Sequence, residues 1–190
     1  LNTPLLNMQD SRMRPNLQEG IWSELKLSKT IQLKGGWLWD TSPRSTIHWY
    51  GIGESVGIYG NGKATDGSAA SYHGHVESNG IGIANVTWVP SKDFSYQIWN
   101  YYADNLFNLV LHKAEVRGRV NGTNVFAGVQ HLWQKSRSPQ DLPIANQYIA
   151  PDETSHVISM KFALSTGSGR QTFSLNYTRI TSHGRFLFPR

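Results

Sequence analysis

Two neighbouring segments near the end of the chain alternate between apolar and polar residues with a period of two. In 171–180, Phe173, Leu175 and Tyr177 point to one side, and the intervening Thr, Ser and Asn side chains point to the other. The segment 156–165 alternates in the same way, and the stretch between the two is rich in Gly and Ser. Because successive side chains of a strand point to opposite faces, this pattern predicts an antiparallel pair of half-buried strands.

Turn signals elsewhere in the chain extend this prediction to the whole fold. The pairs Asn79-Gly80 and Asn121-Gly122 are typical of tight turns between antiparallel strands. No segment has a convincing long helical period, and no unit repeats at a fixed spacing. The sequence therefore predicts an all-β protein. We expect an eight-stranded antiparallel jelly-roll β-sandwich, in which two sheets bury each other's inner faces.

The 190 residues are most economically organised around one domain. Pro4 and Pro15 interrupt any long helix in residues 1–24, which we interpret as an extended N-terminal arm. Residues 25–181 are predicted to form the jelly-roll domain. Residues 182–190 are too short and too punctuated by Gly and Pro to pack alone, and they are interpreted as a C-terminal tail.

The charge is distributed unevenly along the chain. The formal net charge is +5, and residues 154–190 contain no Asp or Glu. A local positive field of this kind suits a polyanion or an acidic neighbouring subunit, and it equally suits an edge strand that charge protects from aggregation. The absence of Cys excludes disulfides and Cys-ligated metals, and no apolar run is long enough for a membrane span.

Nothing in the sequence points to catalysis. Carboxylates are sparse and show no pairing of the glycosidase type, residues 60–63 (GNGK) lack the full phosphate-loop pattern, and no GxSxG is present. His73 and His75 would share one face of a strand, but no third ligand stands at an obvious spacing, so a surface or interface role is favoured over a metal. We expect no enzyme activity, no catalytic residue, no bound metal and no cofactor.

Aromatic residues gather in a segment that we interpret as a polar connection between strands. They are Phe94, Tyr96, Trp99, Tyr101 and Tyr102. Three interpretations remain open for this cluster. It fills the core, it forms a ligand- or membrane-binding surface, or it lies beneath a neighbouring subunit.

The last third of the chain, 142–190, resembles the end of a picornavirus-like capsid jelly roll. Its LPIANQYIAPDETSHVISMKFALS leads through a Thr/Ser-rich turn into two long strands, and the closing TRITSHGRFLFPR is similar to the C-termini of comovirus and nepovirus coat proteins. The chain length also resembles the small coat protein of that type. Residues 1–80 match only in general layout, and the lack of Cys departs from the pattern.

The resemblance implies a structural coat protein that assembles into an icosahedral shell around positive-strand RNA. Its partners would be other copies of itself, a larger companion coat protein and non-specifically bound viral RNA, with no membrane. The chain would be released from a polyprotein and would occur in the virion and the host cytoplasm. The implied strands are 25–38, 69–77, 81–89, 106–117, 123–133, 144–149, 156–165 and 171–180.

Candidate contact residues follow from that interpretation. For the subunit interface they are Arg185, Phe186, Phe188 and Arg190 of the tail, with Tyr101 and Tyr102 of the aromatic cluster. For RNA, Arg12 and Arg14 of the arm are candidates, through salt-dependent phosphate contacts. The alternatives are a glycan- or receptor-binding β-sandwich head, such as a viral fibre knob or a lectin, and an actinoporin-like membrane-binding protein. The last lacks the N-terminal amphipathic helix of that family.

Overall fold

The computed structural model describes residues 1–6, 15–44, 46–60, 62–166, 169, 171–181 and 184–187. Within them, nine strands and two short helices form the regular structure. In chain order they are β1 (Leu17–Lys26), β2 (Ile31–Ser42), β3 (Tyr50–Gly51), α1 (Ile52–Ser55), β4 (Ile81–Ser91), β5 (Phe94–Ala103), β6 (Phe107–Val120), β7 (Thr123–Ser136), the 3-10 helix η1 (Ile144–Asn146), β8 (Thr154–Ser165) and β9 (Thr172–Ile180).

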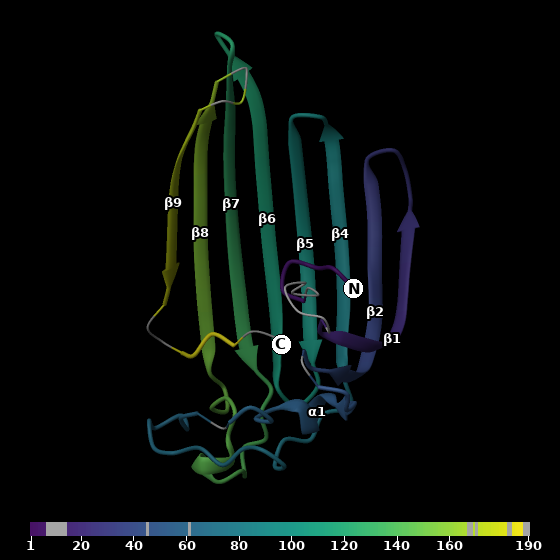
Figure 1. Cartoon of the computed structure of the whole chain (residues 1–190), viewed down its shortest axis with the longest axis vertical. Helices are drawn as coiled ribbons and strands as arrows, with labels where there is room; N and C mark the ends of the chain where they lie inside the picture. The colour runs from purple at the N-terminus through teal and green to yellow at the C-terminus, as the bar shows by residue number, and fades with distance from the viewer. Residues whose placement is uncertain are drawn as a thin grey trace.

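The strands form a single antiparallel sheet (Figure 1). Its order is β1-β2-β4-β5-β6-β7-β8-β9, with the short β3 beside β2. The prediction of an all-β antiparallel fold is confirmed. The two-layer jelly-roll sandwich is wrong, because every described strand lies in this one sheet and pairs mainly with its neighbours in the chain. Alternation along a strand indicates that one face is apolar, but it does not indicate what covers that face.

The two ends of the sheet differ in their connections (Figure 1). At the turn end, short turns join β1 to β2, β4 to β5, β6 to β7 and β8 to β9; the longer segments 43–80 and 137–153 lie at the opposite, loop end. The predicted turn at Asn121-Gly122 is confirmed, with φ of 48° and 80° at its two residues. Asn79-Gly80 lies directly before β4 and joins no hairpin.

Several implied strand boundaries need correction. The implied strand 25–38 is in fact a hairpin of β1 and β2, whose turn is closed by the Ser28 hydroxyl accepting from the backbone N–H groups of Thr30 and Ile31, each at 3.1 Å. Residues 69–77 belong to the loop region, and 144–149 holds only η1. The aromatic segment expected to be a connection is strand β5 itself, paired on both sides.

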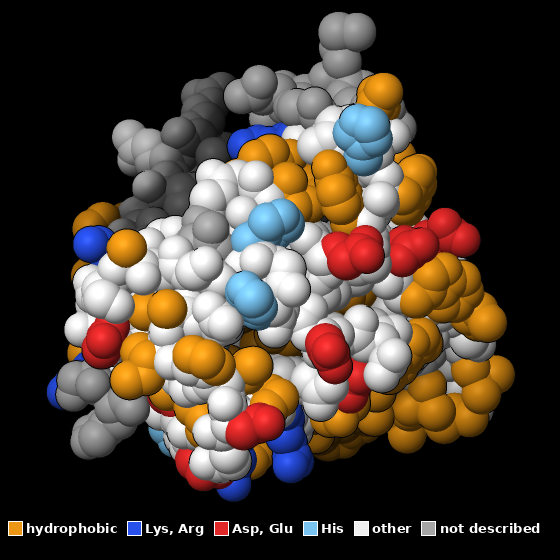
Figure 2. All heavy atoms as spheres, turned by 90° about the horizontal axis from the view of Figure 1, so that it is seen from below, with side chains coloured by type: hydrophobic (Ala, Val, Ile, Leu, Met, Phe, Trp, Pro, Cys, Tyr) orange, Lys and Arg blue, Asp and Glu red, His pale blue; other side chains and the backbone are white. Residues whose placement is uncertain are grey.

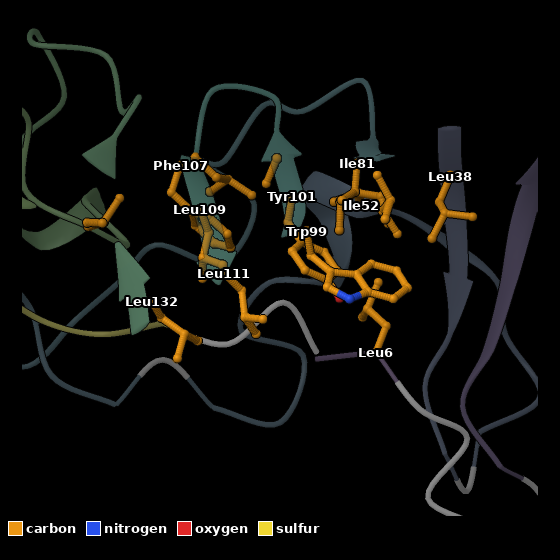
Figure 3. Close-up of a cluster of buried hydrophobic side chains, with 14 of the residues drawn as sticks. Leu6, Leu38, Ile52, Ile81, Trp99, Tyr101, Phe107, Leu109, Leu111 and Leu132 are labelled. Atoms are coloured by element: carbon orange, nitrogen blue, oxygen red, sulfur yellow. The ribbon is translucent and has the colours of Figure 1, made fainter. Parts of the chain in front are cut away.

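The hydrophobic core lies on one face of the sheet, near the loop end (Figure 3). Figure 3 shows Trp99, Tyr101 and Leu109 projecting from the strands toward Ile52 of α1 and Leu6 of the N-terminal segment. Tyr101 and Leu109 are fully buried there. The loops and the N-terminal segment thus replace the second sheet that the sequence led us to expect.

The C-terminal segment 184–187 packs against the same face. The Gln134 side chain donates to the Leu187 carbonyl at 2.7 Å and accepts from the Leu187 N–H at 2.9 Å. The Arg185 guanidinium donates to the carbonyls of Lys63 and Ala64 at 2.9 and 2.7 Å. Segment 184–187 is therefore tied to the sheet and to the loop end, where Phe186 packs against the core.

Among the described residues, no helix has both the length and the hydrophobicity that a membrane crossing requires.

Candidate functional site

The strand register sorts the side chains into two faces with opposite chemistry. The face that we call the apolar face carries large hydrophobic residues that are exposed or half-buried and that lie outside the hydrophobic core. It includes Ile21, Leu25, Leu33, Trp37, Val86, Trp88, Ile98, Tyr102, Val110, Val116, Val129, Trp133, Ile158, Met160, Phe162, Leu164, Phe173, Leu175 and Tyr177. An exposed apolar surface of this extent marks an interaction surface, not an ordinary water-exposed one.

Aromatic side chains stand at both ends of this apolar face. Trp37 and Tyr102 lie toward the loop end, and Trp88 and Phe94 lie toward the turn end, where their rings meet edge to face at 5.8 Å. The Trp37 ring lies across Gly82, where an added Cβ would sit 3.2 Å from the ring carbons. Aromatic bands at the two ends of an apolar strip are typical of a surface that meets a membrane at both interfaces.

The opposite face, which we call the polar face, changes character along the strands. Toward the loop end it carries the core described above. Toward the turn end it is open and polar, with Thr, Ser, Asn and Gln side chains on β4, β5, β8 and β9. The core therefore covers only half of the polar face.

Charged groups on the open half of the polar face form two clusters. On β6, Glu115 bridges Lys113 at 2.8 Å and Arg117 at 2.9 Å. Between β1 and β2, Glu24 accepts from Lys34 at 3.0 Å. Positive charges outnumber negative ones in both clusters. Glu115 is shared by Lys113 and Arg117, and Glu24 has Lys26 two residues further along β1 in addition to Lys34.

The polar face of the strands is basic overall. Its cations are Lys26, Lys34, Lys113, Arg117, Arg119 and Lys161, against the carboxylates of Glu24 and Glu115. Arg117 and Lys161 both lie over the ring of Phe126, at 5.3 and 5.9 Å from its centroid. The ring holds two cations close together on the open half, which suits an anionic ligand or solute passing over this face.

Three histidines form a row on the apolar face that the sequence did not reveal. The rings of His112 and His131 stack at 6.2 Å, and those of His131 and His156 stack at 5.4 Å. His131 Nε2 lies 3.2 Å from His156 Nδ1, and the Tyr96 hydroxyl lies 2.8 Å from His112 Nδ1. The three residues are far apart in the sequence, so only the strand register could have indicated this row.

The loop end presents a different surface (Figure 2). Seen from that end, acidic and histidine side chains are scattered among polar and hydrophobic ones. A hollow of about 310 Å³ opens there, and its lining includes His75, Glu77, Asp141 and Tyr148. The loop Asp66 carboxyl accepts from the Ser68 hydroxyl and N–H, which lowers its pKa below the ordinary value. The loop end is thus more acidic than the polar face of the strands.

The structure places the predicted interface residues in different surroundings. Tyr101 is in the core, stacked on Trp99 at 6.1 Å, and Tyr102 points to the apolar face. Arg185 and Phe186 contact this same chain at the loop end and the core. Phe188 and Arg190, together with the predicted RNA-contact residues Arg12 and Arg14, lie outside the described residues. The interface and RNA-contact roles are not tested by these positions.

The paired histidines of the sequence do not share a strand. His73 and His75 lie in the loop region, where His73 Nδ1 is 2.9 Å from the Val56 carbonyl. In the described ranges, no group of three or more His, Asp or Glu side chains is arranged to hold a metal ion.

The solved structures that this fold resembles are outer membrane proteins of Pseudomonas aeruginosa. OpdK aligns with a TM-score of 0.72 at 15% identity, over 95% of this chain and 42% of its own. OccK8 (OprE) aligns with a TM-score of 0.78 at 15% identity, over 99% of this chain and 47% of its own. OccK2 (OpdF), solved in complex with glucuronate, aligns with a TM-score of 0.69 at 11% identity.

These similarities concern the fold, and the chain spans less than half the length of each of these proteins. No protein-family model matches the sequence, and no curated protein matches it either.

The comparisons overturn the coat-protein interpretation. The neighbours are bacterial outer membrane proteins, so the plant-virus coat-protein family and the capsid function are wrong. The expected partners, viral RNA and a companion coat protein, are wrong as well. The virion and host cytoplasm are wrong as locations, and the exclusion of a membrane is wrong too. The glycan-binding head and the actinoporin-like protein find no support either. The neighbours are channel proteins, not enzymes, which agrees with the prediction of no enzyme activity.

The error has a physical origin in the C-terminal third. The sequence pattern of two alternating, aromatic-rich strands is the same whether their apolar side faces a second sheet or lipid. Both environments are hydrocarbon, so both favour the same side chains. The strands offered one usable signal, since β6 and β7 each reach 14 residues, well beyond the usual strand of five or six.

Proposed function

We propose that this chain forms part of the wall of a β-barrel channel in a bacterial outer membrane. The apolar face would meet lipid, and the polar face would line a water-filled lumen. The observation that carries the proposal is the division of the sheet toward its turn end, where one face is exposed hydrocarbon and the other is open, polar and charged. In transmembrane barrels, strands alternate between these two environments.

Aromatic placement supports the same orientation. The rings near both ends of the apolar face would sit at the two membrane interfaces, with Val86, Ile98 and Val110 between them in the hydrocarbon. Transmembrane barrels have short turns on the periplasmic side and longer loops outside the cell. By that rule the turn end faces the periplasm and the loop end faces the exterior.

The sheet has two edges, β1 and β9, and each is paired on only one side by the described residues. In lipid, unpaired backbone groups are too costly to leave at an open edge, so a spanning sheet closes into a barrel. The proposal therefore implies further strands between β9 and β1, whether from a longer chain or from other copies. A barrel of 16 to 18 strands leaves an aqueous channel, roughly twice the sheet described here.

The basic polar face supports small anions as the solutes. Carboxylates pair well with Lys and Arg, and a low-dielectric wall around a charged lining concentrates solutes of the opposite sign. Two of the similar structures were solved with carboxylate compounds, OpdK with vanillate and OccK2 with glucuronate. We propose small carboxylates as the solute class for this channel.

The loop end and the core would narrow the lumen. Leu6, α1 and the segment 184–187 pack on the polar face beside the open basic half. A solute entering from the loop end would pass the narrowing formed by the core before it reaches Lys113 and Arg117. The core would therefore select solutes by size, and the basic part of the polar face would then select them by charge.

Planar-bilayer recording of the full-length protein tests this function. In a salt gradient, we expect discrete conductance steps with a reversal potential that favours anions. The double variant Lys113→Gln with Lys161→Gln should shift the reversal potential toward cations, because both charges lie on the proposed lumen wall.

Lys92→Gln is the matched control, since Lys92 lies in the β4–β5 turn and off the polar face of the strands. It should leave the selectivity nearly unchanged. Absence of conductance, or equal selectivity in the double variant and the original protein, would overturn the proposed channel.

A further inference from the structure

A hollow of about 500 Å³ opens on the apolar face across β6 to β9. The small side chains of Ala114 and Ala127 leave space there between the larger side chains of Met160 and Tyr177. Most of the lining is hydrocarbon. Uniform contact with hydrocarbon does not require a recess in the apolar face. The shape of the hollow therefore points to a specific apolar group that occupies it.

A row of basic side chains borders this hollow on the side of the loop end. Following the strands from the hollow, Ala114 is succeeded on the same face by His112, Val129 by His131 and Tyr177 by Arg179. His156 and Lys135 complete the row on β8 and β7. We refer to these five residues, His112, His131, Lys135, His156 and Arg179, as the basic row.

The basic row is organised by its own contacts. The stacking of the three imidazoles and the 3.2 Å approach of His131 to His156 fix their rings along the strands. No carboxylate lies on the apolar face of the described residues from β6 to β9. Lys135 and Arg179 therefore present positive charge, and the imidazoles present N–H donors, without a negative partner on this face.

The row lies where β7 and β9 end, on the side of the loop end. Lys135 is the next-to-last residue of β7 and pairs with Thr154. Arg179 is the next-to-last residue of β9 and pairs with Ile158, four residues further along β8 toward the turn end. The hollow begins two residues further toward the turn end and extends into the hydrocarbon band. A lipid has the same layout, with a polar head at the interface and acyl chains below it.

We propose that the basic row and the hollow together bind one anionic, phosphate-bearing lipid. The phosphate lies on Arg179, Lys135 and His156, and one acyl chain occupies the hollow beside Met160 and Tyr177. This inference rests on the proposed membrane position, in which the loop end faces the outer leaflet. Arg and Lys near a membrane surface attract anionic headgroups, and a phosphate accepts hydrogen bonds from several donors at once.

Charge favours a lipid over a second copy of the chain. A twofold interface on this face would set the basic row against the row of its partner, and like charges brought together oppose association. An anionic lipid neutralises the row and fills the hollow in a single step.

Native mass spectrometry of the full-length protein in neutral detergent micelles tests the proposal. The probes are diphosphoryl lipid A, phosphatidylcholine and inorganic phosphate, each titrated at equal concentrations. We expect retention of lipid A alone. The double variant Lys135→Gln with Arg179→Gln should weaken lipid A binding about thirtyfold, since each cation at a membrane surface contributes roughly fivefold. Ala127→Phe, which fills the hollow, should weaken it as well.

Lys113→Gln is the matched control, because Lys113 follows His112 on β6 but points to the polar face. It should leave lipid A binding unchanged. Full retention of lipid A by the double variant would overturn the proposal, as would equal retention of phosphatidylcholine. Retention of inorganic phosphate alone, or a dimer mass that the double variant abolishes, would also overturn it.

The channel and the lipid site can fail separately. Bilayer recordings of the Lys135/Arg179 variant should match the original conductance, because neither residue lies on the polar face. If the protein showed no conductance but still bound lipid A, the proposed channel function would be wrong and the proposed lipid site would stand.

Discussion

The two faces of strand β9 are almost equally open to their surroundings, yet they are chemically opposite. Phe173 and Leu175 on the apolar face are 67% and 65% exposed, and the neighbouring Thr, Ser and Asn side chains on the polar face are exposed as well. Toward the loop end, by contrast, Tyr101 and Leu109 on the polar face are fully buried. Burial of large side chains in the described strands is therefore confined to the loop end of the polar face, and on β9 the two open faces differ in polarity alone.

This difference separates two sources of stability. The loop-end core is stabilised by water exclusion within the chain, as in any soluble domain. The apolar face gains nothing in water and becomes favourable only against hydrocarbon. Mutations in the core should therefore change the free energy of unfolding in any solvent. Mutations on the apolar face should change it only when that face contacts the membrane.

The largest effect is expected in the core. Leu109→Ala removes a fully buried side chain and should lower the free energy of unfolding by about 2–5 kcal/mol, from lost transfer energy and the cavity left behind. Denaturant unfolding in lipid vesicles measures it. Leu175→Ala, on the exposed apolar face, is the control, and an equal loss there would remove the distinction between core and surface.

A charge on the apolar face should cost nearly as much, but only in a membrane. Leu175→Arg should lower the free energy of unfolding in vesicles by about 2–4 kcal/mol if the residue lies near the bilayer centre. Ser174→Arg, one residue away on the polar face, should stay within about 0.5 kcal/mol. Similar effects of the two variants would mean that the faces do not differ in environment.

The smallest effect concerns a turn outside both faces. Gly122 has a φ of 80°, and an added Cβ there would meet no atom within 4 Å. Gly122→Ala should therefore cost about 1 kcal/mol through backbone strain alone. Gly118→Ala, without a positive φ and equally uncrowded, should be neutral or slightly stabilising. A larger loss at Gly118 would contradict the turn geometry.

The sequence allowed the strands to be predicted better than their surroundings. The segments 156–165 and 171–180 lie close to β8 and β9, and the turn at Asn121-Gly122 was found because its backbone demands those residue types. The β4–β5 hairpin was missed, because its turn lacks Gly or Pro and its aromatic residues suggested a surface. Which face meets lipid is not encoded in the period of two.

The candidate site could not be predicted from the sequence for a related reason. The three histidines of the apolar face lie on three different strands, as do Lys34, Lys113 and Lys161 of the polar face, and the strand register alone brings each set together. The uneven charge of the C-terminal third was noticed, but it is divided between faces, with Lys161 on the polar face and Arg179 on the apolar face. A net charge cannot show that division.

Cysteine accessibility along β8 tests the central claim most directly, because the chain contains no cysteine of its own. Single cysteines at positions 157 to 164 would be treated with a membrane-impermeant, water-soluble thiol reagent after reconstitution into vesicles. We predict labelling at 159 and 161, on the polar face, and protection at 158, 160, 162 and 164, on the apolar face. Uniform labelling, or labelling of the even positions, would contradict a sheet with one face in water and the other in lipid.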